Sequence, residues 1–244
     1  ENLFFEYNGK AIKAPDFAVM RTIYPLLSSA LEKAGVRVFN NSETSRICND
    51  KRLTHSVLSF CGIPMMRSLF FDKRFFSSNA ANALKYPLIL KTARGHGGTQ
   101  VYMIENSSSL SDTLQTVQDN EFLVQEVCDT VGRDLRVYIM GGKILCPILR
   151  TSSGFRSNYS LGGKAEVYTP NSDELATINR VLKQIKFKPD FIGLDFLKDG
   201  DRLIFNEIED VVGTRMLYAA AGINAAKVYS DYISKTNKKR RDVL

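Results

Sequence analysis

The chain has 244 residues, of which 44% are hydrophobic and 24% charged, and it carries a formal net charge of +7. These proportions are ordinary for a soluble globular protein, and the length suffices for one large domain or two small ones. No apolar run approaches the roughly 18 residues that a membrane-spanning helix needs, so the sequence predicts no contact with a membrane.

The positive charge is concentrated at the C-terminal end of the sequence. Between Lys235 and Leu244, five basic residues accompany a single acidic one. A terminal run of like charge is typical of a solvated tail, with binding to an acidic partner as the alternative. Because the rest of the chain is only weakly basic, the sequence predicts no nucleic-acid-binding face.

The four cysteines and two histidines follow neither a metal-site pattern nor a disulfide pattern. The cysteines form no C-x-x-C pair, and His55 and His96 lack zinc spacing. Free thiols in a reducing cytoplasm are therefore expected.

The N-terminus has no features of a signal peptide. Because the chain begins within a predicted strand, we expect further sequence upstream.

Turn signals and hydrophobic periodicity divide the chain into strands and helices. Asn8-Gly9 predicts an N-terminal hairpin, and Asn49-Asp50 predicts the start of a helix. The first 39 residues have the strand–helix–strand order of a small α/β unit. The predicted helices are 25–34, 51–61, 79–84, 109–118, 172–185 (capped by Ser172 or Asp173), 214–220 and 224–234, and the predicted strands are 3–7, 10–12, 36–39, 67–71, 88–91, 100–104, 122–127, 134–139, 143–150, 191–197 and 203–208.

A glycine-rich loop separates two of the predicted strands. It contains Gly95, Gly97 and Gly98, while Lys91 precedes it and Arg94 lies within it. Glycines let backbone N–H groups wrap a phosphate, and the two cations supply complementary charge. The loop is not a Walker A motif, because no Gly-Lys-Ser/Thr follows. A flexible hairpin turn is the alternative interpretation.

Two arginines, Arg136 and Arg150, occur within apolar predicted strands. Buried arginines are seldom unpaired, so each needs an anion from the protein or from a ligand. The alternative is an arginine that extends from an edge strand into water.

Three carboxylates interrupt the two apolar strands that flank the Asp199-Gly200 turn. Asp195 lies on the first strand, and Glu207 and Glu209 lie on the second. Pairing of the strands can bring Asp195 close to Glu207, and the two glutamates face the same side of their strand. Converging carboxylates repel one another, and a divalent cation that prefers oxygen ligands, such as Mg²⁺, relieves the repulsion. The alternative is a set of solvated carboxylates on an edge hairpin.

Five segments combine these features in a fixed order. They read FNNSETSRICNDKRLTHSVLSFCGIP, YPLILKTARGHGGTQVYMIEN, FLVQEVCDTVGRDLRVYIMGGKILCPILR, FRSNYSLGG and GLDFLKDGDRLIFNEIE. In this order they resemble the ATP-grasp superfamily, most closely the RimK-like carboxylate–amine ligases. The resemblance implies an α+β ATP-grasp fold whose two α+β lobes clasp ATP. The expected boundaries are 1–45 for a truncated preATP-grasp α/β remnant, 46–124 for the central lobe, 125–234 for the C-terminal lobe and 235–244 for the basic tail.

The resemblance also implies ATP and two Mg²⁺ ions as cofactors, with Mn²⁺ as a substitute. Lys51 and Lys91 would contact the phosphates beneath the glycine loop, and Glu126 and Val127 would present backbone groups to the adenine. The remaining implied residues are Asp134 at the ribose side, Arg156, Ser157 and Asn158 along the phosphate and acyl-phosphate region, Arg136 at the acyl substrate or supporting this shell, and Asp195, Glu207 and Glu209 at the metals, with Glu207 bridging the two ions.

The activity implied by the resemblance is ATP-dependent ligation of a carboxylate to an amine through an acyl phosphate, with release of ADP and phosphate. Arg156, Asn158 and Arg136 are the residues implied in catalysis. The expected partners are small-molecule or peptide substrates, without nucleic acid or membrane, and homo-oligomerisation stays open. The alternatives are an ATP-grasp small-molecule kinase and a non-catalytic nucleotide-binding module that engages an acidic partner.

The sequence departs from the RimK-like pattern at one place. That pattern reads E-x-N followed by a Ser-Pro-Gly turn, whereas here Glu207-Ile208-Glu209 precedes Asp210-Val211-Val212-Gly213. A glutamate is a competent oxygen ligand, but it makes the site about one charge unit more negative. Arg215 either neutralises this additional charge or binds the carboxylate of the acceptor.

Overall fold

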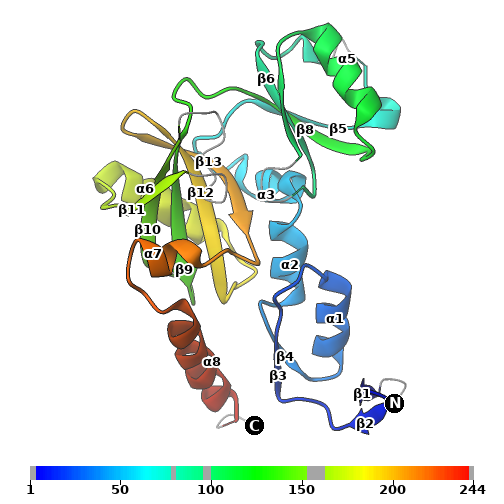
Figure 1. Ribbon diagram of the computed structural model, residues 1–244, viewed down its shortest axis with the longest axis vertical. Helices are drawn as coiled ribbons and strands as arrows, with labels where there is room; N and C mark the ends of the chain where they lie inside the picture. Colours follow the sequence, from blue (N-terminus) through cyan, green and yellow to red (C-terminus); the bar gives the residue numbers. More distant parts are fainter. Residues whose placement is uncertain (1–3, 78–80, 96–99, 153–162, 242–244) are drawn as a thin grey trace.

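The computed structural model describes residues 4–77, 81–95, 100–152 and 163–241. Two separate β-sheets form its framework (Figure 1). Helix α3 (Lys51–Leu58) lies between them, and α2 (Ser42–Cys48) lies beside the lower of the two. The mixed α+β class predicted from the sequence is therefore confirmed. Within the described ranges, no helix combines the length and the apolarity needed to cross a bilayer.

A four-stranded antiparallel sheet, the upper sheet, has the strand order β5-β8-β6-β7. Its core contains Leu88, Leu90, Phe122 and Val124, which pack against Leu110 of α5. Helix α5 begins with a capping box at Asn106, which satisfies N–H groups of its first turn. The bounds are β5 (Ser68–Asp72), β6 (Leu88–Thr92), β7 (Val101–Ile104), α5 (Ser107–Thr116) and β8 (Glu121–Glu126), with a short 3₁₀ helix at Lys73–Phe75.

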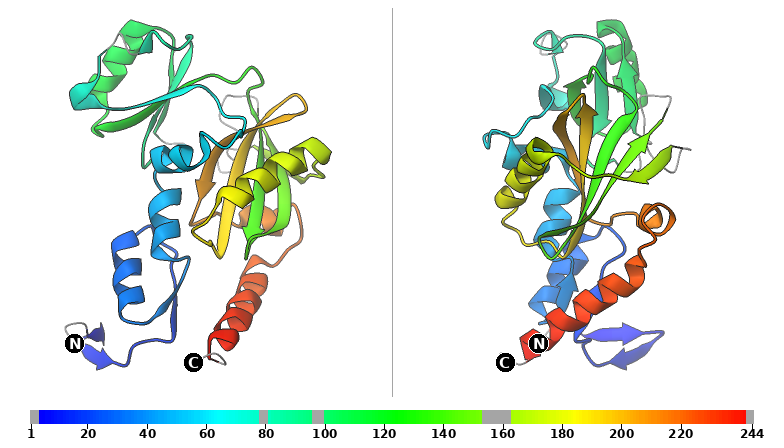
Figure 2. Two further views of the ribbon diagram at one scale, coloured as in Figure 1. Left: turned by 180° about the vertical axis from the view of Figure 1, so that it is seen from behind. Right: turned by 90° about the vertical axis from the view of Figure 1, so that its left-hand side faces the viewer.

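A five-stranded antiparallel sheet, the lower sheet, has the order β11-β10-β9-β12-β13. Helix α6 covers one of its faces, and α7 with the start of α8 covers part of the other (Figure 2). The uncovered part of that second face lies toward the upper sheet, so polar groups there are accessible from the space between the sheets. The bounds are β9 (Arg133–Met140), β10 (Lys143–Thr151), β11 (Lys164–Val167), α6 (Ser172–Gln184), β12 (Phe191–Asp199), β13 (Arg202–Glu209), α7 (Arg215–Ala219) and α8 (Ala225–Arg241).

A β-bulge at Asn206 changes the face of the sheet toward which the following side chains of β13 point. From the turn outward, Asp199 pairs with Arg202 and Phe196 pairs with Phe205, but Asp195 then pairs with Glu207. Asn206 is the additional residue. In an unbroken ladder Asp195 would face Asn206, and Glu207 would point toward the core beneath α6. The bulge therefore keeps Phe205 and Ile208 in that core and places Glu207 on the opposite face, beside Asp195.

The N-terminal part forms a small unit beside α2. It contains the predicted hairpin, β1 (Phe5–Tyr7) and β2 (Lys10–Ile12), whose turn residues Asn8 and Gly9 have φ of 49° and 75°. It also contains α1 (Pro25–Lys33) and a parallel pair formed by β3 (Phe17–Val19) and β4 (Arg37–Phe39). Asn40 attaches this unit to the lower sheet, because its side chain bonds Asp190, Phe191 and Asp210.

Several elements differ from those predicted. Three elements, β3, α2 and β11, were not predicted from the sequence, although Asn41 is a good cap for α2 and accepts a hydrogen bond from Thr44 N. The cap of α6 is Asn171 rather than Ser172 or Asp173. Helix α8 extends to Arg241, so the basic segment continues a helix. The helix expected at 79–84 falls partly outside the described residues.

Candidate active site

A cavity of about 150 Å³ lies between the two sheets. The upper sheet lines it with the face that carries Ile89, Lys91 and Gln125, and the lower sheet lines it with β12 and β13. The segment 126–134, which connects the sheets, closes one side. The lining residues include Lys51, Ile89, Lys91, Gly95, Gln125, Glu126, Val127, Asp134, Leu197, Asn206, Glu207, Ile208 and Glu209.

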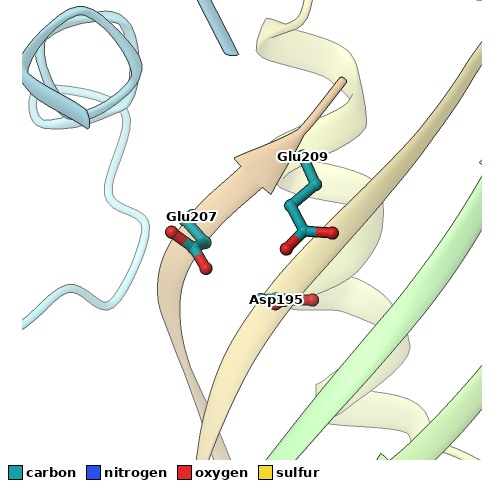
Figure 3. Close-up of side chains that lie close together, drawn as sticks. All are labelled: Asp195, Glu207 and Glu209. Carbon is teal, nitrogen blue, oxygen red and sulfur yellow. The ribbon is translucent and has the colours of Figure 1, made fainter. Parts of the chain in front are cut away.

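Three carboxylates converge at the lower side of the cavity, where Glu207 and Glu209 line the wall and Asp195 is buried. Oxygen atoms of Asp195, Glu207 and Glu209 all lie within 4.8 Å of one another, as Figure 3 shows for their side chains. Glu207 comes from the bulged part of β13, and Glu209 extends over Asp195 on β12. Such a set of hard oxygen donors fits Mg²⁺ or a similar divalent cation, and its mutual repulsion is otherwise unfavourable. The sequence prediction that these three side chains approach one another agrees with this geometry.

Asp195 is also the centre of a buried ion-pair network. Arg136 donates from Nε at 2.8 Å and from a terminal nitrogen at 2.6 Å to the two carboxylate oxygens, and Arg150 donates to Oδ2 at 2.8 Å. Oδ2 thus accepts two hydrogen bonds and Oδ1 one, which leaves Oδ1 with room for a metal ion. Burial opposes the charge, but the two guanidinium groups outweigh it and lower the pKa of Asp195 to about 2.

The two buried arginines find their anions within the protein. Arg150 pairs with Asp134 as well as with Asp195, and Arg136 pairs with Glu209 at 2.8 Å. Burial raises the pKa of Glu209, and Arg136 partly offsets this. Arg136, and not Arg215, therefore neutralises the additional charge of Glu209. Arg215 is exposed, and among the described residues no ion pair engages it.

Two lysines stand opposite the carboxylates. Lys51 at the first turn of α3 donates to the Gly95 carbonyl at 2.5 Å and lies 3.6 Å from Glu207. Lys91 on β6 donates to Gln125 Oε1 at 3.0 Å and to Asn206 Oδ1 at 2.8 Å. Burial is the main cause that lowers the pKa of Lys91 to about 8; Glu207 opposes this shift and the nearby Lys51 adds to it. The cavity therefore combines two cations with a carboxylate cluster.

Gly95 marks the start of the glycine-rich loop. A Cβ atom there would collide with Thr92 Oγ1 and would approach Gln100 Oε1 to 2.8 Å, so a larger residue would displace these two hydrogen-bonded side chains. Glu126 and Val127 line the cavity where the chain leaves β8, and Asp134 lines it while its carboxylate pairs with Arg150. The other predicted site residues, Gly97, Gly98, Arg156, Ser157 and Asn158, lie outside the described residues.

Three polar residues in or beside this site were not predicted from the sequence: His55, Gln125 and Asn206. Gln125 and Asn206 accept the hydrogen bonds of Lys91, and His55 Nε2 lies 3.2 Å from the Asn206 carbonyl oxygen. A polar side chain within an apolar strand, as Gln125 is in FLVQEV, was an available signal. Burial, together with the nearby Lys91, lowers the pKa of His55 to about 4.

We expect His55 to make the fold acid-sensitive. Its pKa lies below the ordinary value of 6.5 in the folded state, so its contribution to stability is complete above pH 6.5 and is lost as the pH falls toward 4. The size is about 3 kcal/mol. Urea unfolding at pH 7 and pH 4 should show this additional loss in the wild type relative to His55→Phe. An equal loss in both proteins would contradict the assignment.

Comparison with protein families agrees with this geometry. Residues 48–233 match the family model of the RimK-like ATP-grasp domain. Human N-acetylaspartylglutamate synthase A is 28% identical over 251 residues, which cover 95% of this chain and 63% of the synthase. The glutamate–LysW ligase ArgX of Sulfurisphaera tokodaii is 28% identical over 250 residues, which cover 95% of this chain and 86% of that ligase. The chain thus spans less than two thirds of the human relative.

The solved structures show the same architecture. D-Alanine–D-alanine ligase from Bacillus anthracis, in its complex with ATP, superimposes with a TM-score of 0.75 at 21% identity, covering 93% of this chain and 80% of the ligase. The fold predicted from the five sequence segments is therefore confirmed as the ATP-grasp fold.

Proposed function

Because the chain belongs to the RimK-like ATP-grasp family, we propose that it is an ATP-dependent ligase that joins a carboxylate to an amine and releases ADP and phosphate. One observation carries this proposal. Glu207 and Glu209 line a single cavity together with Lys51 and Lys91, and the buried Asp195 lies within 4.8 Å of both glutamates. This is the charge arrangement that a metal–triphosphate complex requires.

The carboxylates would hold the metal ions. A bound Mg²⁺ or Mn²⁺ would supply Lewis-acid neutralisation of the phosphate oxygens. Glu207 and Glu209, whose side chains are 28% and 29% exposed, are the accessible donors. Oδ1 of the buried Asp195 completes the set, and Asp195 shares Arg136 with Glu209. We propose that these three side chains would hold two ions, with Glu207 as a ligand of both. The ion-pair network fixes Asp195 in its charged state, as a metal ligand must be.

The cations would bind the phosphates and the apolar wall would bind the base. Lys51 and Lys91 provide charge from two different elements, next to Gly95. Ile89, Leu197 and Ile208 offer apolar surface, and Glu126 and Val127 provide backbone groups beside it for the adenine edge. We assign Asp134 to the ribose side of the same cavity, as a residue that Arg150 orients.

The chemistry is difficult because a carboxylate is a poor electrophile at neutral pH. Its phosphorylation would give an acyl phosphate with a good leaving group, which the amine then attacks. Arg156, Ser157 and Asn158 are proposed along this region from the sequence alone. Arg136 is better explained as a support for Asp195 and Glu209 than as a direct ligand of the acyl substrate, since both of its partners are protein carboxylates.

The substrates belong to the classes of small molecules or peptides that carry a carboxylate and an amine. The names of the human and archaeal relatives place glutamate among the groups that those proteins join. Exposed Arg215 follows the carboxylate strand, which supports an anionic acceptor as the second substrate. The four free cysteines support a cytoplasmic location.

The test is product analysis with purified protein, MgATP and a panel of carboxylates and amines that includes glutamate. If the protein is a ligase, mass spectrometry will detect an amide product, and ADP will be released only when both substrates are present. A stable phosphoester without an amine would instead indicate a kinase. No ADP release with any pair, together with retained ATP binding, would favour a non-catalytic nucleotide-binding module.

We expect ATP binding to weaken at high pH. The buried Lys91 has a pKa of about 8 in the free protein, and phosphate binding favours its charged form, so binding takes up a proton above that pH. Affinity should fall by up to about tenfold between pH 8.5 and 9.5. Calorimetry in buffers of different ionisation enthalpy measures the proton uptake. Lys91→Met should bind ATP weakly and without this pH dependence. If the variant kept the pH dependence of the wild type, the assignment would be contradicted.

A further inference from the structure

Asn206 occupies an unusual position between the two halves of the cavity. It is the bulge residue of β13, so it has no partner in the ladder with β12, and it directly precedes Glu207. Its side-chain oxygen accepts a hydrogen bond of 2.8 Å from Lys91 Nζ, which belongs to the upper sheet. A single residue of the carboxylate strand thus contacts the buried cation on the other side of the cavity.

The surroundings of Asn206 hold both ends of this contact in place. Its carbonyl oxygen lies 3.2 Å from His55 Nε2 on α3, and the neighbouring Phe205 N donates to the Pro64 carbonyl at 2.8 Å. On the other side, the amide nitrogen of Gln125 donates to Ser68 Oγ at 3.1 Å. This bond orients Gln125 so that its oxygen faces Lys91. The ammonium group is therefore held between two oriented amide oxygens, one from each sheet.

We propose that Asn206 is a positioning residue that holds Lys91 at the place where the nucleotide phosphates bind. The inference rests on the proposed nucleotide-binding function and extends it to a residue outside the phosphate and metal contacts. Without the Asn206 oxygen, a flexible lysine side chain would lose one of its two acceptors and its restricted orientation. The bulge serves two purposes on this account, because it aims Glu207 at the metals and Asn206 at the lysine.

The experiment measures binding of the non-hydrolysable analogue AMP-PNP with Mg²⁺ by calorimetry, and of adenosine by NMR titration. Asn206→Leu preserves the size of the side chain but removes the acceptor. We expect it to weaken AMP-PNP binding about tenfold and to leave adenosine binding within about twofold, because only the phosphates depend on Lys91. Asn120→Leu, at an exposed asparagine in the turn before β8, is the matched control and should bind both as the wild type does.

A double-mutant cycle separates positioning from general damage. If Asn206 acts through Lys91, Asn206→Leu should add no further loss of AMP-PNP affinity in a Lys91→Met background. Additive losses, a parallel loss of adenosine binding, or unchanged AMP-PNP affinity in Asn206→Leu would overturn the inference. If Asn206→Leu does not fold, Asn206→Ala is used in its place. Absence of AMP-PNP binding to the wild type would overturn the proposed function itself and the inference with it.

Discussion

Glu207→Gln should reduce ATP turnover more than 100-fold while the protein stays folded. Glu207 is the carboxylate that the bulge turns toward the cavity, and its side chain is 28% exposed, so it is free to bind metal. A metal ion supplies several kcal/mol of charge stabilisation at the phosphates, which corresponds to a loss of about 100-fold or more when it is removed. Glutamine keeps the size of the side chain but is a much weaker ligand.

The measurement is ADP release by the purified variant with saturating substrates, together with thermal unfolding without metal. We expect an unchanged or slightly raised Tm in the absence of metal, because one of three repelling carboxylates is neutralised. Glu166→Gln, at an exposed position of β11 in the same sheet, is the matched control and should turn over ATP normally. Near-normal ADP release by Glu207→Gln would refute the metal assignment.

Arg150→Met should reduce the free energy of unfolding by about 3–5 kcal/mol, the range expected when one partner of a buried ion pair is removed. The guanidinium group of Arg150 binds both Asp134 and Asp195, and all three side chains are almost completely buried. Methionine fills a similar volume but leaves Asp134 without the group that neutralises it. Urea unfolding at pH 7 measures the difference.

Two further variants show whether the effect comes from burial. Arg202→Met breaks the ion pair with Asp199, in which the arginine side chain is 77% exposed, and should change stability by less than about 1 kcal/mol. Adding Asp134→Asn to Arg150→Met should recover part of the lost stability, because the unpaired buried charge is removed. Equal destabilisation by Arg150→Met and Arg202→Met would show that the network contributes no more than a surface ion pair.

Local signals in the sequence were sufficient for most of the elements around the site. The apolar runs predicted most strands of both sheets, and Asn8-Gly9 and Asp199-Gly200 correctly marked hairpin turns. The local signals failed where contacts between distant segments determine whether a strand forms. Strand β3 is only three residues long and exists because β4 pairs with it in parallel, and β11 is an edge strand of four residues on β10. Such short segments carry too little periodicity to be predicted.

The sequence by itself determined which residues carry charge at the site and in what order they occur. The carboxylates, the lysine before the glycine loop and the five ordered segments were enough to predict the ATP-grasp fold. Their roles at the site stay predictions, and those of residues 97–98 and 156–158 concern positions outside the described structure.

Only the tertiary structure decided how those charges are paired. The spacing of Asp195 and Glu207 suggested a simple hairpin, but such a hairpin would bury Glu207 beneath α6, and the bulge at Asn206 is what turns it to the cavity. Likewise, the sequence left open whether Arg136 and Arg150 bind a ligand or the protein. In the folded protein both arginines donate hydrogen bonds to Asp195. The physical reason is that strand register and burial arise from packing across distant segments, which no local pattern encodes.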